Sequence, residues 1–407
     1  MRTEVALAEP VVPVGRGWTT AVVLANVGVF AAWLGPIQVL LAKQSEAVAP
    51  GNKEAVFGLV TGIGAAVSVA ANPLFGALSD RTGSRFGRRV PWVLGGAVGG
   101  AIGLLVLAGA GRVAWMLLGW CLVQLFCNAL LAAITAAVPD RVPKLQRGVV
   151  GGWVALAQTL GALVGVGLAT AIGGITAGYV ACAVFLLLSV VPYLLVSADQ
   201  RLPVGERPAF SLKAFWISPT QHPDFGWAWL TRFLMNLGNG LGTLYLFFYL
   251  QDAVRYHNPD TGVLMLTAVY SLCVVGTAVV SGAWSDRLAR RKVFVIGAGM
   301  VMAVATLILA VWPTWPGALT GAVILGAGFG VYLSVDFALL TEVLPSARDR
   351  AKDLGVVNIA NSLPQVIAPA IAAPVVATLG GYPVLYALAA AVTLLGAVLV
   401  GKIQSVA

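Results

Sequence analysis

Three ionisable side chains lie inside long apolar stretches of this chain, where a charge is costly. They are Arg232, Asp336 and, near the end of its stretch, Glu342. Ionisable groups at such positions usually face a polar path or a partner of opposite charge. Asp336 can accept a proton, whereas Arg232 effectively cannot lose one. The residue types therefore predict proton coupling at Asp336, with a purely structural Arg232–Asp336 ion pair as the alternative.

Polar side chains near these charges follow helical spacing. Arg232, Asn236 and Asn239 lie at i, i+4 and i+7, which is one face of a helix. Other polar or aromatic groups that could contact a solute are Asn26, Phe30, Trp33, Gln124, Asn128, Tyr332, Asn358 and Asn361. Each amide could instead be interhelical hydrogen-bond glue, worth about 0.6 kcal/mol, and the two aromatic residues could be packing. Taken together, the stripes favour a polar solute path.

Twelve stretches of mostly apolar residues, between Trp18 and Val400, must position these groups. Each stretch has roughly twenty residues, enough to cross a hydrocarbon core of about 30 Å as a helix. With 59% hydrophobic and 10% charged residues, a water-soluble domain of this length would lack a polar surface. We therefore expect an all-α membrane protein with twelve transmembrane helices, embedded in a lipid bilayer.

The net charge of +9 reports orientation in the membrane. If the N-terminus is cytoplasmic, only Lys43, Lys53, Arg112 and Arg255 lie in outer loops, and all other Lys and Arg outside the spans lie on the inner side. This asymmetry predicts a multi-pass protein of a bacterial plasma membrane with both termini cytoplasmic. The basic residues form no clustered face, so no nucleic-acid partner is expected.

Neither a metal nor a cofactor is expected. The four cysteines, Cys121, Cys127, Cys182 and Cys273, lie within spans and lack zinc or redox spacing, so they are predicted to be packing residues. No nucleotide-binding loop is visible, so a solute would have to be driven by an ion gradient or by its own gradient.

The second half of the chain copies the first. The segment Gly76–Arg81 returns as Gly282–Arg287, an offset of about 206 residues, and Gly148 to Gly174 returns as Gly355 to Gly381. Six spans per copy is an even number, so both copies enter the bilayer in the same sense. We expect a six-helix half over 1–198, a cytoplasmic linker over 199–225 and a second half over 226–407, with any solute site between the halves.

The loop after the second span carries the pattern Gly76-x3-Asp80-Arg81-x-Gly83-x-Arg85, and a degraded copy with Asp286 and Arg287 follows the eighth span. This pattern resembles the signature loop of the major facilitator superfamily, and the resemblance covers the whole chain. It implies the major facilitator fold, two parallel six-helix halves that rock around a central cavity lined by the first, fourth, seventh and tenth spans.

The signature loop is expected to act as a gate latch. A carboxylate at a helix C-terminus is disfavoured by the helix dipole, so Asp80 needs a positive partner. Gly76, one turn earlier, would let the span that begins near Gly355 approach, so that its N-terminal amides receive the carboxylate. The alternative is a basic loop that only fixes topology.

The segment from Asp80 to Pro91 resembles glycoside-pentoside-hexuronide cation symporters and sucrose-type carriers, although the first span has no carboxylate. The expected function is therefore proton-coupled symport of a small polar solute by a monomeric secondary transporter, and the resemblance implies a sugar or glycoside as the solute. A proton-driven exporter of a drug or secondary metabolite is the alternative. A membrane enzyme or receptor would need a catalytic constellation or a soluble sensor, and neither is visible.

Overall fold

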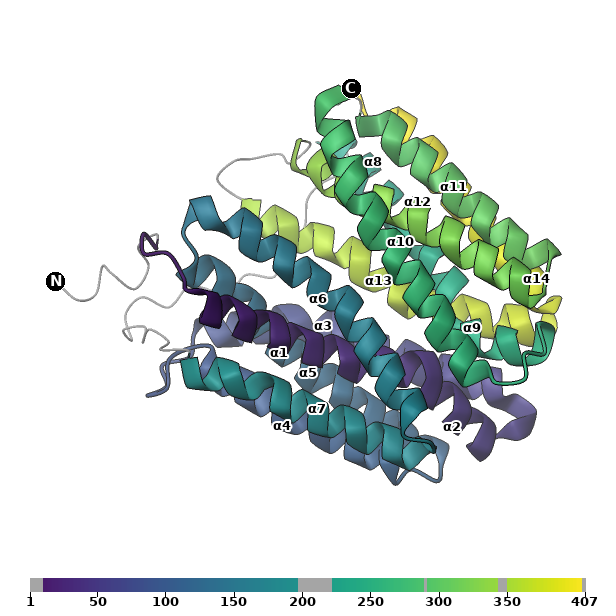
Figure 1. The fold of residues 1–407 in the computed structure, drawn as a ribbon, viewed down its shortest axis with the longest axis horizontal. Helices are drawn as coiled ribbons and strands as arrows, with labels where there is room; N and C mark the ends of the chain where they lie inside the picture. The colour runs from purple at the N-terminus through teal and green to yellow at the C-terminus, as the bar shows by residue number, and fades with distance from the viewer. Residues whose placement is uncertain (1–9, 197–221, 289–290, 343–349, 405–407) are drawn as a thin grey trace. The chain divides into compact units, whose positions relative to one another are not determined.

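The computed structural model describes residues 10–196, 222–288, 291–342 and 350–404. Within these ranges the chain is helical apart from short connections (Figure 1). It divides into two compact units. Unit 1 comprises Met1–Pro50 and Ile63–Phe210, and unit 2 comprises Gly51–Gly62 and Ser211–Ala407. The expected all-α membrane fold is confirmed, while the exact division into halves at residues 198 and 226 stays a prediction.

The described part of the chain before the central linker comprises six helices of at least 19 residues and three short helical segments. They are α1 (Arg16–Gly35), η1 (Pro36–Leu40), α2 (Leu41–Val48), η2 (Pro50–Asn52), α3 (Lys53–Asp80), α4 (Val90–Ala108), α5 (Val113–Arg141), α6 (Lys144–Ala171) and α7 (Ile175–Val196). The first span is longer than the sequence predicts. It continues through the π-helical turn η1, which begins at Pro36, to Val48, because a proline without an N–H is accommodated by a local change of helical pitch.

The helices after the linker repeat this plan. They are α8 (Pro223–Leu244), α9 (Leu246–Phe248), η4 (Tyr249–Ala253), α10 (Pro259–Leu288), α11 (Arg291–Val311), α12 (Trp315–Glu342), α13 (Arg350–Thr378), α14 (Gly381–Leu399) and η5 (Val400–Lys402). Eleven described helices are long and apolar enough to cross a membrane. The bent pair formed by α8 with α9 and η4 makes a twelfth when it is counted as one span.

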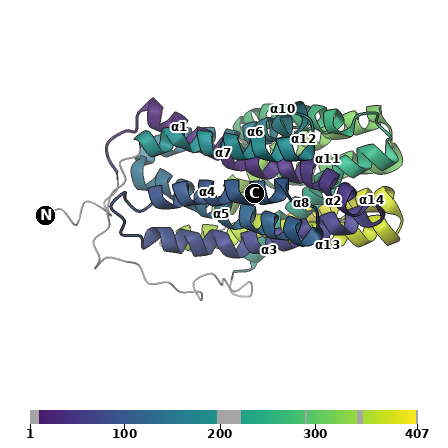
Figure 2. The same cartoon turned by 90° about the horizontal axis from the view of Figure 1, so that it is seen from below.

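Small residues set the close helix crossings in unit 1. Figures 1 and 2 show α1 beside α6 and α7, and the three helices pack together. A Cβ on Gly35 or on Gly165 would clash with the backbone of the facing helix, and one on Gly28 would clash with Ser189. In a membrane, where lipid is as apolar as leucine, such close backbone packing is a main source of helix association.

Unit 2 has the same pattern of neighbours. The crossings α8 with α14, α8 with α13, and α11 with α12 and α14 correspond to α1 with α7, α1 with α6, and α4 with α5 and α7. Gly238 on α8 lies against Thr393 on α14, as Gly28 on α1 lies against Ser189 on α7. The internal repeat of the sequence is therefore a repeat of helix packing.

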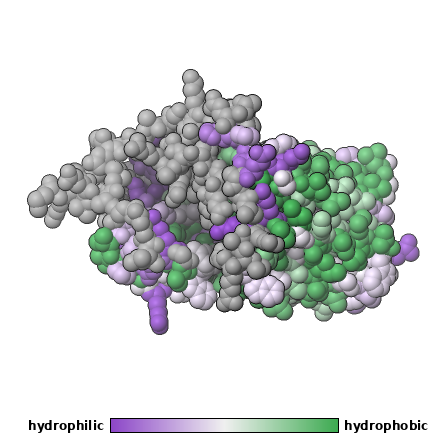
Figure 3. Space-filling model, turned by 90° about the horizontal axis from the view of Figure 1, so that it is seen from above, coloured by the Kyte–Doolittle hydropathy of each residue, from purple (hydrophilic) through white to green (hydrophobic). Residues whose placement is uncertain are grey.

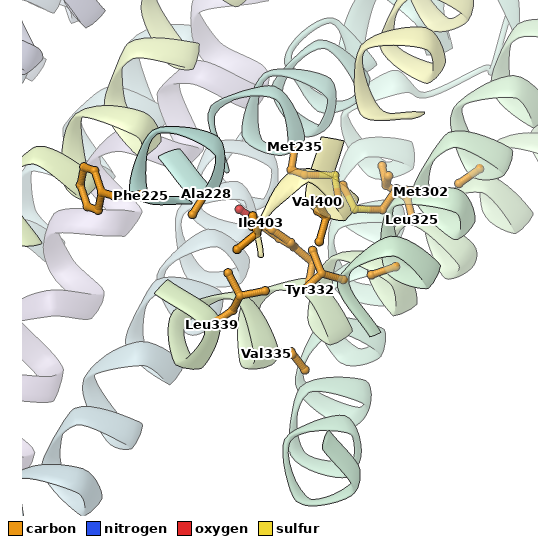
Figure 4. Close-up of a cluster of buried hydrophobic side chains, with 13 residues drawn as sticks. Phe225, Ala228, Met235, Met302, Leu325, Tyr332, Val335, Leu339, Val400 and Ile403 are labelled. Carbon is orange, nitrogen blue, oxygen red and sulfur yellow. The ribbon is translucent and has the colours of Figure 1, made fainter. Parts of the chain in front are cut away.

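An apolar cluster fills the interior of unit 2. Tyr332, Val335 and Leu339 on α12 meet Met302 on α11 and Ile403 after η5 (Figure 4). Tyr332 is 1% exposed, so its ring is part of this cluster while its hydroxyl remains free to join polar groups. By burying Tyr332, the cluster also fixes the orientation of Asp336, which lies one turn after Tyr332 on the same face of α12.

Many large apolar side chains are exposed on the helix surfaces. Leu188, Leu195, Leu272, Val279 and Val311 are at least 64% exposed. Figure 3 shows an extended hydrophobic area on the described face. Exposed apolar area of this extent is not compatible with a solvated monomer and fits a surface surrounded by lipid.

Candidate functional site

A buried ion pair joins two helices of unit 2. Arg232 on α8 donates from Nη1 to Oδ2 of Asp336 on α12. The Arg232 side chain is 10% exposed and that of Asp336 is 3% exposed. The sequence left open whether the two residues couple a proton or form a purely structural pair, and the structure brings the two groups into direct contact. Charge neutralisation within the pair is what makes two ionised groups tolerable inside a membrane span.

Amide and phenol groups complete the surroundings of this pair. Arg232 Nε donates to Asn361 Oδ1 on α13 at 2.7 Å. The Nδ2 group of Asn236 lies 3.3 Å from both Asn361 Oδ1 and the Tyr332 hydroxyl. Tyr332 precedes Asp336 by one turn on α12. Three helices, α8, α12 and α13, therefore hold one continuous polar network.

Asn239 belongs to a different contact from the one its helical spacing predicts. Its Oδ1 accepts a hydrogen bond from the Tyr270 hydroxyl on α10 at 3.2 Å. Asn239 thus ties α8 to α10, two turns after Arg232. The side chain of Asn358, another sequence candidate, lies outside the described residues, as does that of Glu342.

A ladder of polar groups lies between α3 and α5 in unit 1. Asn128 Nδ2 donates to Ser68 Oγ at 2.9 Å, and Asn72 Nδ2 donates to Asn128 Oδ1 at 3.3 Å. Gln124 accepts from Asn128 Nδ2 through its backbone oxygen at 2.7 Å. One turn further, the indole of Trp120 fills the space beside Gly64. Positions at i, i+4 and i+8 on both helices therefore face one another.

The polar candidates on α1 are buried, but two of their polar atoms are unsatisfied. Asn26 is 1% exposed and donates to the Val22 carbonyl one turn earlier at 2.8 Å. Among the described residues, Asn26 Oδ1 and Trp33 Nε1 have no hydrogen-bond partner. Phe30 packs edge-on to Trp33, with ring centroids 5.9 Å apart. Unsatisfied buried groups of this kind are expected where a ligand or water completes the site.

The structure thus assembles two clusters, each within one unit. Unit 1 holds the ladder with Gln124 and Asn128, and also the α1 residues Asn26, Phe30 and Trp33. Unit 2 holds Arg232, Asn236, Tyr332, Asp336 and Asn361. That both clusters border one central cavity stays a prediction.

The signature loop is organised by an arginine that the sequence analysis did not single out. Arg89 Nη2 lies 2.6 Å from Asp80 Oδ1, and its Nε lies 2.8 Å from Asp140 Oδ2 at the end of α5. The Nη1 group of Arg89 donates to Ser79 Oγ at 2.7 Å, and Arg88 pairs with Asp140 at 2.6 Å. The positive partner that Asp80 requires is therefore supplied within unit 1.

Burial and charge act against each other at Arg89. Desolvation disfavours the buried guanidinium, but the carboxylates of Asp140 and Asp80 outweigh it and raise the pKa of Arg89 above its ordinary value. The group therefore stays charged at any physiological pH. The amide contact expected for Asp80 at the span near Gly355 stays a prediction.

The other loop residues lie in the connection between α3 and α4. These are Arg81, Gly83 and Arg85, and the guanidinium of Arg85 sits over the Phe86 ring at 4.7 Å. In the second copy, the backbones of Asp286 and Arg287 form the end of α10, while their side chains lie outside the described residues.

A third charged cluster lies at the start of α3, and we call it the Lys53 cluster. Lys53 Nζ lies 2.8 Å from Asp252 Oδ1 and 3.2 Å from Gln251 Oε1. The Tyr382 hydroxyl donates to Asp252 Oδ2 at 2.7 Å. All these residues belong to unit 2, although Lys53 precedes the central linker by far in sequence. The first turns of α3 are thereby fixed to η4 and α14.

Several contacts that sequence reasoning missed join residues that are far apart in the chain. Arg89 and Asp140, Ser68 and Asn128, and Lys53 and Asp252 are separated by 51, 60 and 199 positions. A usable signal did exist for the ladder, because Gly64, Ser68 and Asn72 repeat the same i, i+4, i+8 spacing as Trp120, Gln124 and Asn128. The partners of the charged groups could not be predicted without knowing which helices are neighbours.

Within the described ranges, no group of three or more His, Cys, Asp or Glu side chains could hold a metal ion. The network around Arg232 consists of a carboxylate, amides and a phenol. Its carboxylate, Asp336, is of a residue type that can accept a proton.

Comparison with known proteins identifies the family of this chain. The model of the Major Facilitator Superfamily matches residues 19–267 and 255–403. No curated protein matches the sequence.

Several solved structures share the fold. A POT family transporter in complex with 5-aminolevulinic acid aligns over 95% of this chain and 96% of its own, with a TM-score of 0.76 and 11% identity. The peptide transporter POT in complex with sulfate aligns over 98% and 97%, with a TM-score of 0.76 and 14% identity. The human organic anion transporter MFSD10 (TETRAN) aligns over 95% and 99%, with a TM-score of 0.68 and 18% identity. At these identities the likeness establishes the fold, and the family model across almost the whole length establishes the relationship: the chain belongs to the Major Facilitator Superfamily and is a multi-pass membrane transporter.

Proposed function

We propose that this protein is a proton-coupled secondary transporter of a small polar solute, and that Asp336 carries the coupling proton. The Arg232–Asp336 pair supports this proposal most directly. In this pair, Asp336 is a protonatable carboxylate that is buried in a span, and its partner Arg232 cannot lose its charge. Protonation of Asp336 would break the pair, and release of the proton would restore it.

The polar character of both clusters supports a polar solute. Amides, a phenol and a guanidinium line the network of unit 2, and amides, a serine and an indole line the ladder of unit 1. These groups match the hydroxyls, amines and carboxylates of small metabolites better than an apolar drug. We therefore favour uptake of a small polar solute by alternating access over export of a drug.

The test is the substitution Asp336→Asn in proteoliposomes with a pH gradient. A permanently neutral side chain imitates the protonated state, so this variant should lose accumulation of solute against a gradient while keeping exchange of solute across the membrane. The measurement compares concentrative uptake with counterflow of the same labelled solute, chosen from a panel of sugars, sugar acids and small amines.

Asp224→Asn is the matched control. It also removes a carboxylate from unit 2, but Asp224 lies at the start of α8 near the surface, where it accepts a hydrogen bond from the backbone of Gln404. This variant should accumulate solute like the wild-type protein. If Asp336→Asn still concentrates solute in response to a pH gradient, Asp336 is structural and the coupling assignment is wrong. If proton influx drives solute efflux instead, the protein is an exporter.

A further inference from the structure

We propose that the transported solute carries a negative charge, and that its anionic group replaces Asp336 on the guanidinium of Arg232 when Asp336 is protonated. This inference rests on the proposed function and adds the class of solute, a small organic carboxylate. It comes from the partners of Arg232 rather than from any bound ligand.

The charge of Arg232 cannot be removed by the transport cycle. A guanidinium keeps its proton at all relevant pH values, so neutralising Asp336 leaves one uncompensated positive charge. Arg232 is 9% exposed. A buried charge that loses its partner is strongly disfavoured, because nothing then offsets its removal from water. A neutral solute cannot offset this cost, whereas an anion can.

The neighbours of Arg232 cannot take over the role of Asp336. Asn361 accepts a hydrogen bond from Nε, but it is a neutral amide. Asn236 and Tyr332 contribute hydrogen bonds without charge. Within the described residues, Asp336 is the carboxylate that contacts this guanidinium. A state with protonated Asp336 therefore contains a vacant position for one negative charge.

The other charged groups of the packed helices lie at helix ends. Asp224 begins α8, Asp260 lies in the first turn of α10, and Arg291 and Lys292 begin α11. On α12, Tyr332 is the titratable neighbour, and η5 ends in Lys402. Arg232 lies inside α8 and contacts Asp336 directly, so among the described residues the charge change at Asp336 acts first on Arg232.

The geometry is suited to a carboxylate in particular. The hydrogen bond from Nε to Asn361 fixes the plane of the guanidinium between α12 and α13, and a planar fork binds a carboxylate with two parallel hydrogen bonds. The Tyr332 hydroxyl, one turn before Asp336 on α12 and 3.3 Å from Asn236 Nδ2, would donate to an incoming carboxylate oxygen. The solute would thus meet the guanidinium that holds Asp336 and one further donor.

Binding can be tested with acids and their isosteric amides, which differ in charge alone. The probes are gluconate and gluconamide, lactate and lactamide, and benzoate and benzamide, added to the purified full-length protein at pH 5.5 and 7.5 with sodium chloride as the ionic-strength control. The readout is the shift in the midpoint of thermal unfolding as a function of probe concentration.

The wild-type protein should be stabilised by at least one acid at pH 5.5 more than at pH 7.5, and by no amide. Asp336→Asn should bind that acid at both pH values, with a dissociation constant at pH 7.5 about tenfold or more below the wild-type value, because a charge-assisted hydrogen bond is worth about 1.5–3 kcal/mol. Asp224→Asn should behave as the wild type does.

The double variant Arg232→Gln with Asp336→Asn removes both charges and avoids leaving a buried charge unpaired. It should fold and lose all stabilisation by acids. Acid binding that survives in this double variant would overturn the proposal, and so would equal binding of acid and amide, or failure of every acid to bind Asp336→Asn better than the wild type.

Proton movement separates this inference from the proposed function. If a neutral amide or sugar drives proton uptake into liposomes, proton coupling holds and the anionic solute class is refuted. If an acid binds through Arg232 but moves without protons, the solute class holds and the coupling is refuted.

Discussion

Arg89 shows how much of the signature loop depends on a single side chain. Its guanidinium contacts two carboxylates and the Ser79 hydroxyl, and it is 2% exposed. Arg88, the adjacent residue of the same type, contacts Asp140 from a more exposed position, with its side chain 13% exposed. The two arginines therefore differ in burial and in number of partners while sharing charge and sequence context.

We predict that Arg89→Gln lowers the free energy of unfolding by about 3–5 kcal/mol, the usual cost of breaking a buried ion pair, whereas Arg88→Gln lowers it by about 1 kcal/mol or less. Because the pKa of Arg89 is raised, its stabilising contribution is present at all pH values below the unfolded pKa and is lost only as the pH rises through the folded one. Thermal unfolding in detergent measures both variants. Equal losses would contradict the central role of Arg89.

Asp80 is expected to act on transport more than on stability. Its side chain is 43% exposed, so its ion pair with Arg89 is partly screened. We predict that Asp80→Asn stays folded and inserted, with transport strongly slowed, as the latch hypothesis requires. Initial rates of uptake at matched protein amounts in the membrane test this, and wild-type rates would refute the latch.

At the scale of elements, glycines decide where helices can meet. On α6, a Cβ on Gly165 would clash with the backbone of α1 at Ala31 and Gly35, whereas no described atom lies within 4 Å of a Cβ on Gly167. The backbone atoms of Ala31 and Gly35 cannot move aside as the end of a flexible side chain could. These two glycines, two residues apart, form a matched pair of positions.

We predict that Gly165→Ala destabilises the protein by about 1–3 kcal/mol through overpacking. Gly167→Ala should be neutral or stabilising by about 0.5–1 kcal/mol, since alanine favours the helix. Thermal unfolding and resistance to proteolysis compare the two. A Gly167→Ala loss as large as that of Gly165→Ala would show that the α1–α6 crossing is not the cause.

The sequence predicts elements well here because hydropathy in a membrane protein is a strong signal. Apolar length predicts the spans, and the repeat predicts the matching packing of α1 with α7 and α8 with α14. The bend after α8 was not predicted. Its cause is tertiary: Tyr245 ends α8, donates to the Glu54 carbonyl at 3.1 Å and packs on Phe57, contacts that no local pattern reveals.

For the candidate site, helical spacing placed polar residues on one helix face but could not assign their partners. Arg232 and Asp336 are in contact, which both sequence alternatives, proton coupling and a structural ion pair, allow. Asn239, on the same predicted face, bonds instead to Tyr270, because one helix face contacts more than one neighbour over several turns. Partner assignment requires the order of helices around α8, which the sequence of that helix does not contain.

At the scale of the whole molecule, the Lys53 cluster offers a test of how α3 is held. Lys53→Met keeps the apolar stem and removes the charge that pairs with Asp252. The pair is partly exposed, so we expect a loss of global stability under about 1 kcal/mol. Hydrogen exchange at the backbone amides of residues 53–62 should nevertheless become several-fold faster, since local opening requires fewer contacts to break.

Arg112→Met is the control for this experiment. Arg112 is exposed in the connection between α4 and α5, and it lies in another predicted outer loop. Mass spectrometry of exchange in the membrane-reconstituted protein compares both variants with the wild type. Unchanged exchange at residues 53–62 in Lys53→Met would show that this ion pair does not hold the start of α3.

The continuity of α3 has a mechanical consequence. Its first ten residues belong to unit 2 and the rest belong to unit 1, yet the helix runs unbroken from Lys53 to Asp80. If the two units move against each other during transport, this helix would have to bend or lose contacts of its first turns, such as the Lys53–Asp252 ion pair. Strain within the helix would then be balanced against the loss of the ion pair at its start. The state of α3 would therefore report on the transport cycle without an attached label.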